Sequence, residues 1–148
     1  MIRYERIFTL VQLTHKNYAW TRIEQEFLSR EAGDSSDRVV RIRTAGPNSG
    51  LTEIESWEHT GVRVKRIRTL PGNIEIPTCQ RYRSSRDSRI STWNGYDYSV
   101  DRYHGSKLPE LVTFSFDDLR SALDFHPPEW VNDEITVLYR KLSRRFAL

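Results

Sequence analysis

Pairs of basic residues separated by one position are the feature of this sequence that most directly suggests chemistry. The pairs are Arg41 and Arg43, Arg63 and Lys65, and Arg81 and Arg83. Arginine outnumbers lysine by 19 to 4, and a guanidinium group presents a planar fork of donors that fits phosphate and carboxylate oxygens. The concentration of arginine as a whole predicts a binding site for an anionic ligand.

The spacing of these pairs is typical of strands, where residues two apart lie on the same face. For residues 37–45 two orientations are open: Arg41 and Arg43 face water with Val40 and Ile42 inward, or the arginines line an interior. An interior lined by arginines is stable only if it is hydrated, paired to acids or occupied by an anion.

Other kinds of chemistry are less well supported by the sequence. The four histidines share no metal-ligand spacing, Cys79 is the only cysteine and excludes an internal disulfide, and the scattered glycines form no phosphate-binding loop.

The net charge of +3 does not identify a partner, but its distribution is uneven. Residues 61–90 hold eight basic and two acidic residues, whereas residues 91–136 hold three basic and nine acidic ones. We expect an anionic small molecule as partner, with RNA at the basic C-terminal stretch or a basic protein at the acidic stretch 110–134 as alternatives. No apolar run approaches the roughly 20 residues of a membrane span, so a soluble, intracellular and cytoplasmic protein is expected.

The secondary-structure elements that carry these residues are predicted to be mostly strands. The predicted strands are residues 1–14, 37–45, 51–59, 61–70, 74–83, 89–93, 96–103 and 111–116. Thr60-Gly61 and Asn94-Gly95 predict tight hairpin turns. Helices are predicted at 117–125 and 136–146, and residues 18–28 fit either a strand or a helix. The pattern predicts a mainly β (α+β) class: one antiparallel barrel or sandwich in a single domain, 1–148.

The order of several segments resembles the CYTH domains, the triphosphate tunnel metalloenzyme superfamily. The C-terminal half carries YSVDRYHG, LPELVTFSF, HPPEW, DEIT and a final FAL. The N-terminal half adds YERIF, RIEQEFLS, RVVRIRT and CQRYR. The resemblance implies an antiparallel tunnel of about eight strands with helices outside, makes residues 22–29 a strand, and favours the inward orientation of Arg41 and Arg43.

In that family, acidic lumen residues hold divalent metals and basic ones hold the triphosphate. This sequence departs from the acidic part of the pattern, where it has Arg3, Lys65, Ile67, Thr113 and Ser115. A lysine of the pattern is replaced by Ile7 and another by Cys79. The basic part survives. The resemblance therefore implies a tunnel that binds phosphate groups but has lost most of its metal ligands.

Three hypotheses follow. The leading one is a non-catalytic or weakly catalytic barrel, a pseudoenzyme that needs no cofactor. It binds a nucleotide, an oligonucleotide signal or a polyphosphate through Arg41, Arg43, Arg63, Lys65, Arg81 and Arg83. The second is a triphosphatase or cyclase with Mg²⁺ or Mn²⁺ at Glu5, Glu53 and Glu55. The third is a protein-interaction module whose tunnel has collapsed.

Overall fold

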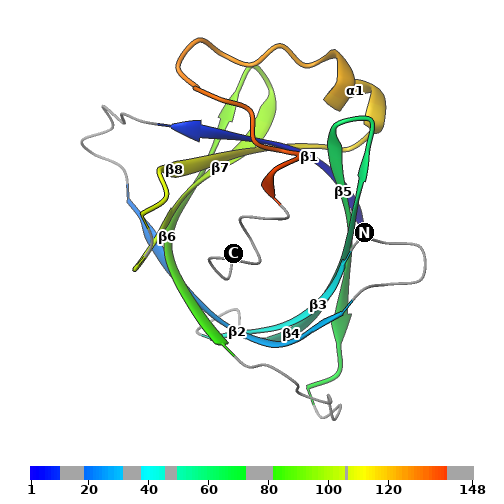
Figure 1. The fold of residues 1–148 in the computed structure, drawn as a ribbon, viewed down its shortest axis with the longest axis vertical. Coiled ribbons are helices and arrows are strands. Elements are labelled where there is room, and N and C mark those ends of the chain that lie inside the picture. Colours follow the sequence, from blue (N-terminus) through cyan, green and yellow to red (C-terminus); the bar gives the residue numbers. More distant parts are fainter. Residues whose placement is uncertain (11–18, 32–37, 46–49, 73–81, 106, 140–148) are drawn as a thin grey trace.

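The computed structural model describes residues 1–10, 19–31, 38–45, 50–72, 82–105 and 107–139. Eight antiparallel strands close into a barrel in the order β1-β5-β4-β3-β2-β6-β7-β8 (Figure 1). The strands are β1 (Ile2–Leu10), β2 (Thr21–Glu31), β3 (Arg38–Thr44), β4 (Gly50–His59), β5 (Val62–Leu70), β6 (Tyr82–Trp93), β7 (Tyr96–Tyr103) and β8 (Glu110–Phe116). The mainly β barrel predicted from the sequence is confirmed.

Two hairpins are closed by the turns that the sequence predicted. Thr60 and Gly61 join β4 to β5 with φ values of 52° and 78°, and Asn94 and Gly95 join β6 to β7 with 48° and 79°. Positive φ at both central residues is the geometry of a primed turn, whose twist matches that of the flanking strands. These turns fix the register that places alternate side chains inside and outside the barrel.

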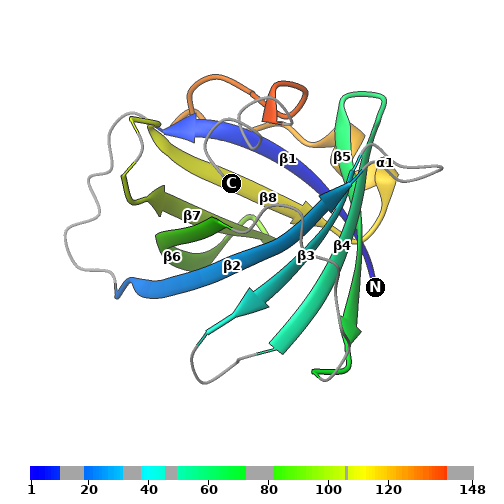
Figure 2. The same cartoon turned by 60° about the horizontal axis from the view of Figure 1, so that its bottom comes forward.

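The main hydrophobic core lies on the outer surface of the barrel. Phe8, Val100 and Phe114 point outward from β1, β7 and β8 and are buried by Phe125, whose ring centroid lies 4.7 Å from that of Phe114. Figure 2 shows α1 (Leu119–Asp124) outside the barrel, where it packs on β1, β5 and β8. The carboxylate of Asp118 caps this helix by accepting from the backbone N–H of Ser121 at 2.7 Å.

The segment after α1 is fixed to the barrel by Arg6. Its guanidinium donates to the carbonyl of Phe125 at 2.8 Å and pairs with Glu134 at 2.8 Å. The chain then runs along β1, where the N–H of Ile135 donates to the carbonyl of Ile7 at 2.8 Å. Among the described residues, no helix is long and apolar enough to cross a membrane.

Some predicted boundaries differ from the observed ones. The strand predicted at 89–93 is the end of the longer strand β6, and most of the strand predicted at 74–83 lies outside the described residues. The resemblance correctly assigned residues 22–29 to a strand, β2. Of the helix predicted at 136–146, residues 140–146 lie outside the described part.

Candidate functional site

The barrel encloses a lumen with a cavity of about 310 Å³. Its wall has two sides of different chemistry. Phe27, Val40, Ile42 and Ile54, from β2, β3 and β4, form an apolar cluster on one side. The other side is polar and is built by β1, β5, β6, β7 and β8. Its principal side chains are Glu5, Arg63, Lys65, Arg86, Asp101 and Thr113.

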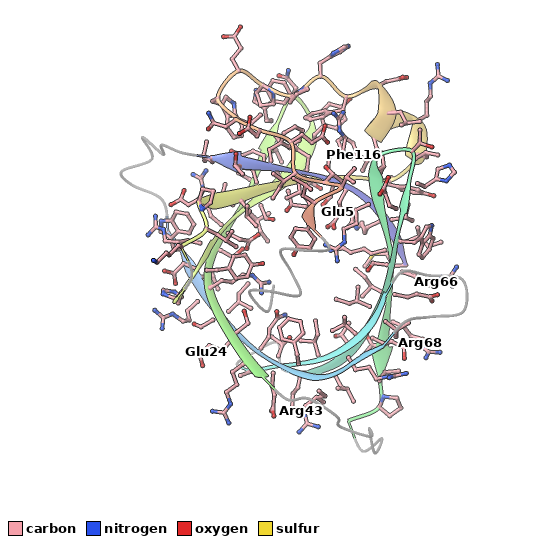
Figure 3. The ribbon with its side chains drawn as sticks, in the orientation of Figure 1. Glu5, Glu24, Arg43, Arg66, Arg68 and Phe116 are labelled. Atoms are coloured by element: carbon pink, nitrogen blue, oxygen red, sulfur yellow. The ribbon has the colours of Figure 1, made fainter. Side chains whose placement is uncertain are left out.

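Glu5 is the centre of the first polar cluster. Its Oε2 lies 2.7 Å from Lys65 Nζ, and its Oε1 accepts from Arg63 Nη1 at the longer distance of 3.5 Å. Both cations come from β5, the hydrogen-bonded neighbour of β1, where Glu5 lies directly opposite Arg63. Figure 3 shows Glu5 inside the ring of strands.

The ionisation of Glu5 follows from this environment. Only 3% of the residue is exposed, and burial by itself raises the pKa of a carboxyl group. The positive charges of Lys65 and Arg63 outweigh burial, so the pKa of Glu5 lies below its ordinary value. Glu5 is therefore a carboxylate at neutral pH, shared between two cations.

Arg86 is the centre of the second polar cluster, and the sequence analysis did not select it as a site residue. Its Nε donates to Asp101 at 3.1 Å and its Nη1 donates to Gln25 Oε1 at 2.7 Å. Ser99 also donates to Asp101, at 3.3 Å. The sequence pattern that could have identified Arg86 is the alternation of polar residues at Ser84, Arg86 and Ser88. It was missed because these residues lie between the strands predicted at 74–83 and 89–93.

The prediction that Arg41 and Arg43 face the lumen is wrong. Val40 and Ile42 line the cavity instead, and the alternation of β3 turns both arginines outward. Arg41 Nε lies 3.1 Å from Glu53 on the outer surface. The physical reason is local: this side of the lumen is apolar, so burying two uncompensated guanidinium groups there would be more costly than burying Val40 and Ile42.

The other basic residues predicted for the site also differ in where they lie. Arg63 and Lys65 lie in the lumen, as described above. Arg83 is exposed and, with Arg43, borders a second hollow of about 870 Å³, whose lining also includes Glu24, Glu26 and Gln25. Arg81 lies outside the described residues. Figure 3 shows Arg43 extending away from the ring of strands.

The three carboxylates proposed for a metal site do not come together. Glu53 pairs with Arg68 at 2.7 Å and Glu55 pairs with Arg66 at 3.3 Å, both on the outer surface, whereas Glu5 lies in the lumen. Within the described part of the chain, no three histidine, cysteine or acidic residues form a cluster that could hold a metal ion. A metal site built on Glu5, Glu53 and Glu55 is therefore excluded by their positions.

The lumen side of β8 carries hydroxyl groups. Thr113 lines the cavity, and Ser115 lies opposite Glu5 in the β1–β8 register. These are two of the positions where the resemblance led us to expect acids. Neutral hydroxyls are weaker ligands for hard divalent cations than carboxylates.

Among the described residues, the two walls of the lumen line a cavity of about 310 Å³. The acidic stretch 110–134 is also engaged within the chain at several positions. Glu110 pairs with Arg102 at 2.8 Å, Asp118 caps α1, and Glu134 binds Arg6. These contacts assign structural roles to acids that the third hypothesis reserved for a basic partner.

Comparisons with known proteins agree with this architecture. No protein-family model and no curated protein sequence matches the chain. A solved structure from Bacillus halodurans, described provisionally as an adenylate cyclase, is similar with a TM-score of 0.52 and 14% identity. The match covers 97% of this chain and 88% of that one. At this identity the likeness concerns the fold, which is the tunnel fold that the resemblance predicted.

Two further structures are similar at slightly lower scores. The inorganic triphosphatase NE1496 has a TM-score of 0.49 and 18% identity, with 93% of this chain and 91% of that chain covered. The PH1819 protein from Pyrococcus horikoshii also has a TM-score of 0.49, at 8% identity, with 99% and 90% covered.

Proposed function

We propose that the tunnel binds a small phosphate compound through Arg63, Lys65 and Arg86, and that it does so without metal-dependent turnover. The ligand is a nucleotide, a short oligonucleotide or a polyphosphate. Charge-assisted hydrogen bonds from guanidinium and ammonium groups to phosphate oxygens supply the affinity.

The observation that carries this proposal is the unequal charge of the lumen. Among the described residues that line the cavity, three are cationic and two are carboxylates. Asp101 pairs with Arg86, while Glu5 is shared between Lys65 and Arg63. One positive charge is therefore in excess. A partly buried charge without a counterion is unfavourable, and a bound anion would neutralise it.

We propose no efficient turnover because the described lumen offers few oxygen ligands for a divalent metal ion. Transfer of a phosphoryl or nucleotidyl group from a triphosphate relies on a metal ion to neutralise developing charge. Divalent cations of this kind need several oxygen ligands. In the described lumen, Glu5 is already held by Lys65 at 2.7 Å, and β8 contributes Thr113 where an acid would be needed.

Calorimetric titration tests the proposal. Inorganic tripolyphosphate and a nucleoside triphosphate are titrated in the presence of EDTA, and again with Mg²⁺ or Mn²⁺. We expect binding that does not require metal, and no release of phosphate or pyrophosphate. Metal-dependent product formation would contradict the proposal and favour a triphosphatase or cyclase.

A matched pair of variants locates the site. Lys65 and Arg66 are adjacent in β5 but point to opposite sides of the barrel wall. Lys65→Met is expected to weaken binding at least about tenfold, the effect of losing one hydrogen bond to a charged group. Arg66→Ala is expected to leave the affinity unchanged. Equal losses in both variants would indicate an outer binding surface instead.

A further inference from the structure

The apolar side of the lumen is a continuous surface. Phe27 on β2 lies directly opposite Ile42 on β3, and Val40 on β3 lies directly opposite Ile54 on β4. Side chains that face each other in this way have Cβ atoms about 4.5–5.5 Å apart. The four side chains pack together, and all of them line the cavity. Figure 1 shows β2, β3 and β4 side by side along one part of the ring.

Charge is confined to the other side of the described lumen. Among the described residues of β2, β3 and β4 that line the cavity, none is charged, and Gln25 is the one polar residue. The cations of the polar side come from β5 and β6 instead, as Arg63, Lys65 and Arg86. One half of the cavity wall can therefore hold an anion, and the other half can hold an apolar group.

The two sides adjoin at both borders between them. At the first border, Ile23 on β2 lies directly opposite Arg86 on β6, and Arg86 donates to Gln25 at 2.7 Å. At the second border, Lys65 on β5 is a diagonal neighbour of Ile54 on β4. Diagonal neighbours in antiparallel strands are about 7–8 Å apart. A small organic group joined to a phosphate at either cation can therefore contact the apolar side.

We infer that the lumen selects organic phosphates that carry a compact apolar group. The phosphate contacts the cations of the polar side, and the organic group packs on the apolar side between Phe27 and Ile54. This selectivity rests on the proposed function and narrows its ligand class, because an inorganic polyphosphate has no group that matches the apolar side.

Burial of apolar surface gives the selectivity its physical basis. An inorganic polyphosphate is charged along its whole length, so oxygens placed against the apolar side would lose hydration without gaining hydrogen bonds. An apolar group placed there releases water from both surfaces, which is favourable. The cavity of about 310 Å³ lies at the lower end of the range of roughly 300–1,000 Å³ for small-molecule sites, so the group must be compact.

Titration with cyclohexyl phosphate and methyl phosphate tests the inference. At pH 8 both esters are dianions, because the second pKa of a phosphate monoester is about 6, so they differ chiefly in the size of the apolar group. A cyclohexyl ring has no π face, which removes stacking on a guanidinium as a source of affinity. We expect cyclohexyl phosphate to bind at least about tenfold more tightly.

The outcomes separate this selectivity from the proposed function. Equal affinity of the two esters would overturn the selectivity while phosphate binding in the lumen stood. Binding of tripolyphosphate without binding of cyclohexyl phosphate would do the same. Failure of both esters and of tripolyphosphate to bind would overturn the selectivity and the proposed function together.

Two adjacent valines of β3 provide a matched pair of variants. Val40→Thr places a hydroxyl group on the apolar side at almost unchanged volume, and we expect it to lower the affinity for cyclohexyl phosphate at least about fivefold. Val39 lies opposite Glu55, and strand alternation turns it to the outer surface. Val39→Thr is therefore expected to leave that affinity unchanged. A preference for cyclohexyl over methyl phosphate that survives undiminished in Val40→Thr would overturn the inference.

Tripolyphosphate affinity is the control for folding, since it depends on the polar side and should be retained in both valine variants. Ile42→Val provides a second test that adds no polar atom. It removes one methylene group from the apolar side and is expected to weaken cyclohexyl phosphate about fourfold, the effect of one buried methylene, with methyl phosphate unaffected. Unchanged binding of cyclohexyl phosphate by Ile42→Val would contradict packing of the organic group on the apolar side.

Discussion

Lys65 binds Glu5 diagonally across the β1–β5 pair, with 2.7 Å between Nζ and Oε2. This contact keeps the only carboxylate of the first polar cluster ionised inside the barrel. Because Arg63 shares the same carboxylate at 3.5 Å, the cluster carries a net positive charge. The four predictions below follow from this arrangement and from the packing around it.

Replacing Glu5 tests the charge balance. Glu5→Gln leaves Lys65 and Arg63 without their shared counterion and is expected to destabilise the protein by about 2 kcal/mol. Fully buried pairs lose roughly 3–5 kcal/mol, but here both cations retain some contact with solvent. The same variant is expected to bind tripolyphosphate at least about fivefold more tightly, because a repelling negative charge is gone.

Urea denaturation measures the stability of this variant, and calorimetry measures its affinity. Glu5→Asp is the matched control, since it retains the charge. Weaker phosphate binding by Glu5→Gln, with metal present, would mean that the carboxylate serves the ligand through a metal ion.

The depressed pKa of Glu5 predicts a pH dependence. The folded-state value lies below the ordinary 4.5, so the stabilising contribution is fully present above pH 4.5 and is lost as pH falls through the folded-state pKa. The difference in unfolding free energy between wild type and Glu5→Gln should be constant from pH 7 to about pH 5 and should shrink at lower pH. Denaturation curves between pH 3 and 7 measure it. A difference that grows on acidification would mean that the pKa is raised rather than lowered.

Because the arginines of β3 point outward, we expect their removal to have little effect on phosphate binding. Arg41→Ala and Arg43→Ala are expected to leave tripolyphosphate affinity within about twofold of wild type, because neither side chain faces the lumen. Arg63→Ala, measured in parallel, should lower it at least about tenfold. If the β3 variants lose binding and Arg63→Ala does not, the ligand binds on the outer surface.

The outer core predicts a large effect on stability. Phe114 is 0% exposed and lies in contact with the rings of Phe8 and Phe125. Phe114→Ala is expected to cost about 3–5 kcal/mol, whereas Leu123→Ala, on an exposed position of α1, should cost less than about 1 kcal/mol. Thermal and urea denaturation distinguish the two. Similar losses would contradict the assignment of Phe114 to the centre of the outer core.

Much of the fold could be predicted from local signals. Asn94-Gly95 and Thr60-Gly61 determine two hairpins because few other sequences adopt positive φ at both central positions. The succession of motifs then distinguished a tunnel from a sandwich, which strand periodicity alone had left open. Because these signals depend on residues close together in the chain, a single sequence is enough to recognise them.

Local signals could not predict which face of each strand points into the lumen. In β3, alternation separates Val40 and Ile42 from Arg41 and Arg43, but it does not say which pair points inward. In this barrel polarity is no guide, because β8 buries Phe114 on the outside under Phe125 while Thr113 faces the lumen. The orientation depends on contacts between distant strands.

Arg86 illustrates a second limit. The turn residues near it suggested that strands end before and begin after this position, whereas β6 runs without interruption from Tyr82 to Trp93. Its pairing with Asp101 becomes visible only through the β6–β7 register, in which Arg86 lies opposite Tyr103. Of the three cations among the described lumen residues, one was therefore missed.

The most direct test of phosphate binding in the lumen is to locate a bound oxyanion. Crystals soaked in tungstate, a heavy tetrahedral oxyanion, give an anomalous signal that marks the site without prior assumptions. We expect one peak inside the barrel, within hydrogen-bond reach of Lys65, Arg63 or Arg86. A peak confined to the second hollow beside Arg43 and Arg83, with none near Lys65, Arg63 or Arg86, would contradict phosphate binding in the lumen.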